Sequence, residues 1–181
     1  NYFTEVFPLI SSDDETVRSA AFKALADLAG PGDQSALISL LPSVNDKSYI
    51  SNIQDAIASS AEKSNEGENM SSAILRAIKT GTAKEKFIPI LARTGGSEAL
   101  KTVLNEFENG NPGMRDICFK TLTDWKDHTA SSALYEICAS GNKTFEEPAF
   151  KGYIAQIRNS VLPDEQKLLL YRKIMPFAIS A

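Results

Sequence analysis

The feature that most constrains this fold is an amphipathic segment that occurs twice, with matching residues 97 positions apart. In residues 111–125 the apolar side chains recur with the spacing of one helical face, and polar side chains occupy the opposite face. Residues 15–28 repeat the pattern, and the matched positions are Val17 and Met114, Arg18 and Arg115, Phe22 and Phe119, Lys23 and Lys120, and Leu25 and Leu122. A helix of this kind buries its apolar face against a neighbour, so the repetition predicts an array of stacked helices.

Helix boundaries along the chain agree with such an array. Starts are expected at Ser12 with Glu15, Asp33, Asp46 or Ser48, Asn69, Thr82 with Glu85, Ser97, Asn111 with Pro112, Thr129, Thr144 with Glu147, and Pro163. Ends are expected near Gly30, Gly81, Gly95, Gly110 and Gly141. The helices group into pairs whose first helices begin near residues 2, 34, 69, 97, 129 and 163, a period of about 32 residues. No segment shows the alternation of a strand, so the predicted fold class is all-α.

Aromatic, proline and cysteine side chains carry further packing predictions. Phe22 and Phe119 are expected to pack at the interfaces between neighbouring pairs. Pro89 lies inside the helix expected over residues 83–94, where it removes a backbone hydrogen bond and predicts a kink. Cys118 and Cys138 each follow an isoleucine on an apolar face. We expect two small core residues there, while a disulfide between neighbouring helices stays open.

Composition narrows the classes of partner. The chain has 181 residues, of which 43% are hydrophobic, and this is enough to bury a continuous core. Its net charge is −4, of which residues 1–60 carry −5 and residues 61–120 carry +1. This balance argues against the basic patch of a nucleic-acid-binding protein, and no apolar run approaches the roughly 18 residues of a membrane span. We therefore expect no nucleic-acid partner and no membrane span.

The two-helix units resemble HEAT repeats, a kind of armadillo-like α-solenoid. The resemblance is carried by V-R-S-A-A-F-K-A-L in residues 17–25 and by M-R-D-I-C-F-K-T-L in residues 114–122. It implies one domain over residues 1–181, built as a right-handed superhelix of about five and a half helix pairs. The Asp and Arg pattern of HEAT repeats is kept only in part, at Asp13, Arg18 and Arg115, whereas Ser51 takes the Arg position of the second pair.

The C-terminal segments A-F-K-G-Y-I-A-Q-I and L-P-D-E-Q-K-L-L-L-Y-R-K are similar to HEAT segments of large bacterial envelope proteins. Those proteins also carry a jelly-roll domain related to sugar-hydrolysing or sugar-binding modules. The similarity implies a periplasmic or cell-envelope location. Both terminal helices are apolar over much of their surface, so we expect a fragment of a longer multidomain chain that self-associates through uncapped ends.

Sites built on histidine, cysteine or glycine are not indicated. His128, the only histidine, is interpreted as a solvent-facing loop residue. Two cysteines with one histidine are too few for a zinc site. The Gly95-Gly96-Ser97 segment lacks the lysine and the preceding strand of a phosphate loop, and a helix end followed by a helix start explains it.

Carboxylate pairs are the remaining candidates for chemistry. Glu66 with Glu68 and Glu146 with Glu147 have the residue types of a glycoside-cleaving acid and base. The first pair lies in a polar linker, and the second lies in the first turn of a helix, where acids suit the helix dipole. We therefore expect no catalytic residue, no metal and no cofactor in this segment on its own.

A partner surface is expected on the second helices of the pairs, which usually line the concave side of such an array. The outward positions of those helices are the candidate binding residues: Asn52, Asp55, Lys86, Arg93, Asp116, Lys120, Gln156 and Arg158. The favoured function is a non-catalytic scaffold that holds a partner protein or a neighbouring domain of its own chain. One alternative is an accessory region of a carbohydrate-processing enzyme whose catalytic domain lies elsewhere. A less favoured alternative is HEAT-type DNA-base repair, which needs a basic groove with aromatic residues.

Overall fold

A computed structural model describes residues 2–64 and 70–178 of the chain. Within these ranges every regular element is an α-helix or a short 3-10 helix, and no strand occurs. The all-α prediction is therefore confirmed. Asn69, Glu66 and Glu68 lie outside the described residues. Contacts divide the chain into two compact units, Asn1–Ala99 and Leu100–Ala181.

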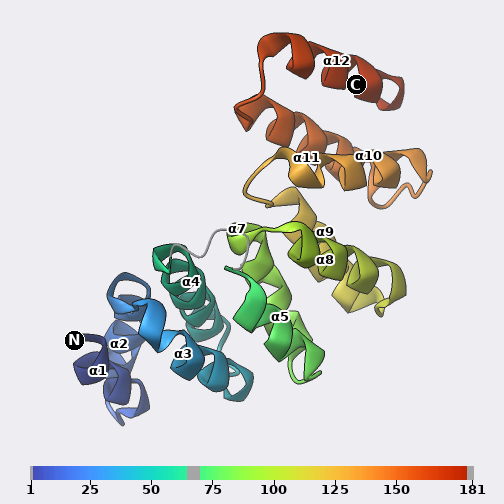
Figure 1. The fold of residues 1–181 in the computed structure, drawn as a ribbon. Coiled ribbons are helices and arrows are strands. Elements are labelled where there is room, and N and C mark those ends of the chain that lie inside the picture. The colour runs from blue at the N-terminus through green and yellow to red at the C-terminus, as the bar shows by residue number, and fades with distance from the viewer. Residues whose placement is uncertain (1, 65–69, 179–181) are drawn as a thin grey trace. The chain divides into compact units, whose positions relative to one another are not determined.

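The first unit is a succession of helix pairs (Figure 1). Its elements are α1 (Tyr2–Val6), η1 (Phe7–Ser11), α2 (Glu15–Leu28), η2 (Pro31–Asp33), α3 (Gln34–Leu40), η3 (Leu41–Ser43), α4 (Lys47–Lys63), α5 (Ser72–Lys79), α6 (Lys84–Phe87), η5 (Ile88–Ile90) and α7 (Leu91–Thr94). Here α2 and α3 both pack against α4, and α5 packs against α6. Leu25, Leu37, Ile53 and Ile57 are completely buried in this unit, and each contributes about 1.5–3 kcal/mol by leaving water.

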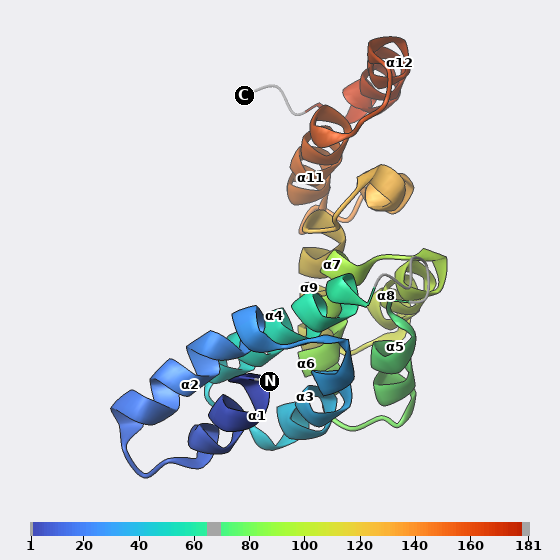
Figure 2. The same ribbon diagram turned by 60° about the vertical axis from the view of Figure 1, so that its left-hand side comes forward.

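The helix α8 (Ser97–Asn109) begins at the end of the first unit, and most of it belongs to the second. The remaining elements are α9 (Pro112–Thr123), η6 (His128–Ala130), α10 (Ser131–Ala139), α11 (Glu146–Asn159), α12 (Asp164–Ile174) and η7 (Met175–Phe177). α11 packs against α9, α10 and α12, as both ribbon views show for α10 and α12 (Figure 2). Leu122, Leu134 and Ile157 form the completely buried centre of this unit.

Helix starts follow the sequence where one residue offers the cap. Asp46 accepts hydrogen bonds from the backbone N–H groups of Ser48 and Tyr49, and Asn111 accepts one from Met114. Both caps were predicted. The cap predicted for α2, Ser12 with Glu15, is wrong. Asp14 is the N-cap residue, and it accepts from the N–H groups of the first turn. Ser12 accepts instead from the N–H of Asp14.

Other predicted caps also differ. The Asp33 carboxylate accepts from the Gly30 N–H and stabilises η2, so it does not cap α3. Thr82 does not cap α6, because the chain enters that helix through Ala83 in a left-handed conformation with φ +54°. The predicted Thr129 cap of α10 is wrong as well. Asp127 caps the start of η6 by accepting from the Thr129 N–H, and α10 follows without a side-chain cap. Phe145 occupies the N-cap position of α11 without a side-chain hydrogen bond, so the predicted Thr144 cap is wrong.

The predicted interruption at Pro89 is confirmed. α6 ends at Phe87, the 3-10 helix η5 contains Pro89, and α7 begins at Leu91. The Lys86 carbonyl oxygen beside this break accepts a hydrogen bond from Gln54 Nε2 of α4 at 2.6 Å. Pro89 has no N–H group to donate to the preceding turn. Gln54 of α4 supplies a hydrogen bond to the Lys86 carbonyl in that turn.

Polar side chains close helix ends about one repeat away. The Ser60 hydroxyl donates to the Gly30 carbonyl oxygen at 2.6 Å, and the Lys63 ammonium group donates to the Ala29 carbonyl oxygen at 2.8 Å. In the second unit, Gln156 Nε2 donates to the Leu122 carbonyl oxygen at 2.7 Å. These partners are separated by 30, 34 and 34 residues. Because the last carbonyls of a helix lack i+4 partners inside it, these bonds let α4 stabilise the chain after α2 and let α11 stabilise the end of α9.

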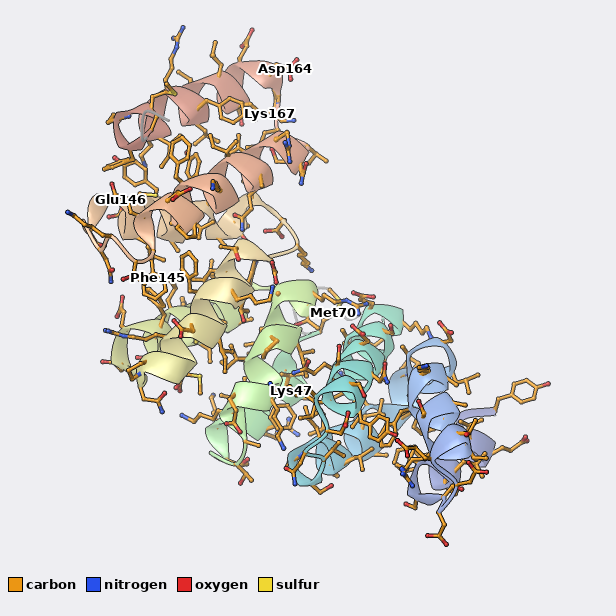
Figure 3. The ribbon with its side chains drawn as sticks, turned by 180° about the vertical axis from the view of Figure 1, so that it is seen from behind. Lys47, Met70, Phe145, Glu146, Asp164 and Lys167 are labelled. Atoms are coloured by element: carbon orange, nitrogen blue, oxygen red, sulfur yellow. The ribbon has the colours of Figure 1, made fainter. Side chains whose placement is uncertain are left out.

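The two matched phenylalanines have different environments. Phe22 is buried and stacks on Tyr49 of α4, with ring centroids 4.2 Å apart. Phe119 is only half-buried and lies among the rings of Phe107 and Phe145. Figure 3 shows Phe145 just before α11, next to Glu146. The expected packing between pairs is confirmed for Phe22, which contacts Tyr49 of the next pair. Phe119 also contacts the next pair, through Phe145, although it is only half-buried.

Both cysteines are free thiols in the core, as expected. Burial raises the pKa of Cys118 to about 12 and also raises that of Cys138. In the part of the chain that the structure describes, no helix has both the length and the apolar character needed to cross a bilayer.

Candidate functional site

Two of the predicted partner-binding residues come together on the first unit. The Arg93 guanidinium of α7 lies 3.2 Å from a carboxylate oxygen of Asp55 on α4 and 2.9 Å from one of Glu62. All three side chains are between two-fifths and about half exposed. Exposed ion pairs of this kind contribute about 0–1 kcal/mol to stability. The three side chains therefore form a surface of mixed charge and add little to the stability of the fold.

The other predicted residues do not form one cluster, and their contacts differ. Lys86 does not project freely, because its ammonium group donates to the carbonyl oxygens of Pro42 and Val44 and so closes η3. Lys120 pairs with Asp124 one helical turn later at 2.8 Å. Asp116 and Arg158 are exposed, and Asn52 is half-buried.

Gln156 is the clear misplacement among the eight. It was expected to face outward from α11, but it is 6% exposed and its amide bonds to the end of α9. Helical periodicity places it at a polar position, whereas its side chain turns inward to donate to the Leu122 carbonyl at the end of α9. Partner binding at the other seven positions stays a prediction.

Two hollows, one in each unit, lie along the first helices of the pairs. In the first unit a cavity of about 320 Å³ lies between α3 and α5, and we call it the α3–α5 groove. It is lined by Ser35, Ile38, Ser39, Pro42, Ala73, Arg76, Ala77, Thr80, Thr82 and Phe87. Small side chains dominate the wall, and Arg76 is its one charged residue.

The second unit has a comparable hollow of about 310 Å³ between α8 and α10, the α8–α10 groove. It is lined by Leu104, Phe107, Glu108, Arg115, Ala133, Glu136, Ile137, Ser140, Asn142 and Phe145. Phe107 and Phe145 meet edge to face there, with ring centroids 5.5 Å apart. The two rings are half-buried, and both can therefore contact a ligand.

Charged side chains line the groove beside these rings. The Arg115 guanidinium donates to the carbonyl oxygens of Phe107 and Glu108 at 3.0 and 3.1 Å, which holds it over the last turn of α8. Glu108 and Glu136 are exposed on the same groove. The groove thus combines an apolar floor with a rim of both charge signs.

A third hollow, of about 220 Å³, lies where α9 and α11 end, and we call it the Trp125 cavity. Its lining is Thr123, Asp124, Trp125, Lys126, Asp127, Ala155, Gln156, Asn159 and Ser160. Trp125 Nε1 and Gln156 Oε1 are buried here without a hydrogen-bond partner among the described residues. A buried polar atom left in that state costs about 1–3 kcal/mol, so this pair requires an explanation.

Of the residues considered for catalysis, His128, Glu146 and Glu147 lie in the described part of the chain. His128 is half-buried at the start of η6, where a loop was expected. Glu147 pairs with Lys151, whose hydrogen bond and charge lower the pKa of that carboxyl group. Across residues 2–64 and 70–178, no three acidic, histidine or cysteine side chains gather as a metal ion would require.

The grooves were not predicted, because the expected partner surface lay on the second helices and both grooves lie along first helices. A signal was available: Leu104 and Phe107 of the first helix α8 and Phe145 before α11 are large apolar residues near helix ends. Their convergence in one groove depends on packing that one sequence cannot show.

Comparison of the chain with protein-family models, with curated protein sequences and with solved structures found no match.

Proposed function

We propose that this chain is a non-catalytic scaffold that binds a partner protein in the α8–α10 groove. The observation that carries the proposal is the pair of half-buried phenylalanines, Phe107 and Phe145, in a groove with a charged rim. Protein interfaces have this composition, with aromatic residues at the centre and polar residues and arginine around them.

The proposal includes the repeat architecture. We infer that the helix pairs stack as HEAT-type repeats in a right-handed superhelix of about five and a half pairs. Its support is the set of side chains that close helix ends 30 to 36 residues away, close to the period of the sequence. Stacked repeats contact their neighbours at this spacing, and they offer long surfaces to partners.

The expected partner presents an apolar side chain to the groove and charges to its rim. An apolar side chain of leucine or phenylalanine size would cover Phe107 and Phe145. Basic residues on the partner would face Glu108 and Glu136, and an acidic residue would face Arg115.

Quantitative copurification tests the proposal. The tagged chain is expressed in cells that make it naturally, and proteins recovered with it are compared with those recovered with Leu104→Glu, which places a charge in the groove. Glu165→Lys on the exposed surface of α12 is the control. We expect at least one specific protein whose recovery falls about tenfold with Leu104→Glu and stays unchanged with the control.

Two further measurements make the result decisive. Circular dichroism of both variants checks that the helices are retained. Glu136→Arg changes the exposed rim without touching the core, and it should weaken recovery of the same protein. Equal recovery with wild type, Leu104→Glu and Glu136→Arg would reject this groove as the partner site.

A further inference from the structure

The Trp125 cavity holds one unsatisfied donor and one unsatisfied acceptor. Trp125 is 4% exposed and Gln156 is 6% exposed, so both side chains are largely shielded from hydrogen bonding with bulk water. Neither Trp125 Nε1 nor Gln156 Oε1 has a hydrogen-bond partner in the described part of the chain. Buried polar groups in folded proteins nearly always have partners, so this pair points to a missing one.

The orientation of Gln156 is set by its other end. Its Nε2 donates to the Leu122 carbonyl oxygen at 2.7 Å, and a carbonyl can only accept. The amide therefore cannot be reversed without losing that bond, and Oε1 remains the end that needs a donor. The indole of Trp125 can only donate. A complementary ligand must supply both an acceptor and a donor.

The lining of the cavity narrows the chemistry of such a ligand. Asp124 and Asp127 lie on the same wall, and each carboxylate has about four acceptor positions, of which Lys120 and Thr129 use some. Lys126 also lines the cavity and offsets one of the two negative charges, so the lining keeps a net negative charge. An anionic ligand is disfavoured by that charge and would give Gln156 no donor. An ammonium ligand would leave the indole N–H without an acceptor.

We propose that the Trp125 cavity binds a neutral primary carboxamide. The carboxamide oxygen accepts from Trp125 Nε1, one of its two N–H groups donates to Gln156 Oε1, and the other donates to a carboxylate of Asp124 or Asp127. A hydroxyl group, with a single donor, satisfies fewer of these groups. The cavity of about 220 Å³ equals the volume of roughly seven water molecules, which suits a carboxamide on a short carbon chain.

This site is independent of the α8–α10 groove, since the two hollows share no lining residue. The carboxamide can belong to a free small molecule or to an asparagine or glutamine side chain of a bound protein. Both sources present the same group to Trp125 and Gln156.

The single tryptophan of the chain makes the test direct. In a nitrogen-15 NMR spectrum of the full chain, one indole N–H resonance reports Trp125. Four probes share a three-carbon skeleton and differ in the polar group: propionamide, propanol, propionate and propylammonium. We expect propionamide to shift the indole resonance saturably and to bind at least about tenfold more tightly than the other three.

Matched variants locate the effect. Gln156→Met should weaken propionamide binding about tenfold, whereas Gln166→Met, on the exposed surface of α12, should leave it unchanged. If Gln156→Met does not fold, Trp125→Phe removes the donor while keeping a ring, and the backbone N–H resonances of Lys126 and Ser160 report binding. No weakening in the folded variant would overturn the proposal.

A second carboxamide probe and the negative results complete the test. N-acetylglutamine methylamide compares a protein-borne carboxamide with propionamide, and tighter binding of either one supports the site and identifies the source. An unshifted indole resonance would show that water alone fills the cavity, and this result would overturn the proposal. Equal or tighter binding of propanol, propionate or propylammonium would overturn it as well.

Discussion

Phe22 and Phe119 share a place in the repeated segment, yet their contributions to stability should differ. Phe22 is 4% exposed and stacked on Tyr49, whereas Phe119 is half-buried. We expect Phe22→Ala to cost about 3–5 kcal/mol and Phe119→Ala clearly less, because a cavity forms only where the neighbours cannot fill the space. Urea denaturation of both variants measures the difference, and a larger loss for Phe119→Ala would contradict these placements.

Cys118 offers a test of core burial by pH. Its folded-state pKa is raised from 9.0 to about 12, so the folded state favours the neutral thiol. The resulting stability is present below pH 9.0 and is lost as pH rises toward 12, because the unfolded thiol ionises first. The stability advantage of wild type over Cys118→Ala should therefore shrink between pH 9.0 and about pH 12. A constant advantage, measured by urea denaturation, would contradict the burial of this thiol.

At the scale of elements, the start of α4 can also be tested by the pH dependence of stability. Asp46 accepts from the Ser48 hydroxyl and from the N–H groups of Ser48 and Tyr49, and these bonds lower its pKa below 3.8. Its contribution is thus present above pH 3.8 and is lost as pH falls through the folded-state pKa.

Two variants separate the cap from its charge. Asp46→Ala should lower the urea midpoint at neutral pH, because the first turn of α4 loses its acceptor. Asp46→Asn keeps an acceptor, so it should resemble wild type at neutral pH and lose less stability on acidification. Identical acid profiles for wild type and Asp46→Asn would show that the charge of this cap has no role.

Elements were predictable from the sequence where a local signal decided them. Pro89, Asp46 and Asn111 act within one helical turn, and all three were placed correctly. The predicted cap, Ser12 with Glu15, is wrong because Asp14, also a good capping residue, lies where its carboxylate reaches the first turn, and only the backbone path decides this. The side chain of Gln156 responds to a carbonyl 34 residues away, and periodicity carries no such information.

At the scale of the whole molecule, repetition predicts the construction of the chain but not its binding surfaces. The period of about 32 residues implied stacked pairs, and hydrogen bonds at 30, 32 and 34 residues fit it. The α8–α10 groove combines side chains from α8, α9, α10 and the residue before α11. Such convergence follows from the packing of whole helices, so the large apolar residues Leu104, Phe107 and Phe145 are visible in the sequence but their meeting in one groove is not.

The central claim is that a partner protein docks between first helices and not along the outward positions of the second helices. Hydrogen–deuterium exchange of the chain, alone and with the protein that copurifies with it, tests this claim most directly. We predict slowed exchange in residues 104–115 and 133–145, which border the α8–α10 groove. Protection confined to the segments that carry Asp55, Lys86, Arg93 and Lys120, with the groove unchanged, would contradict the claim.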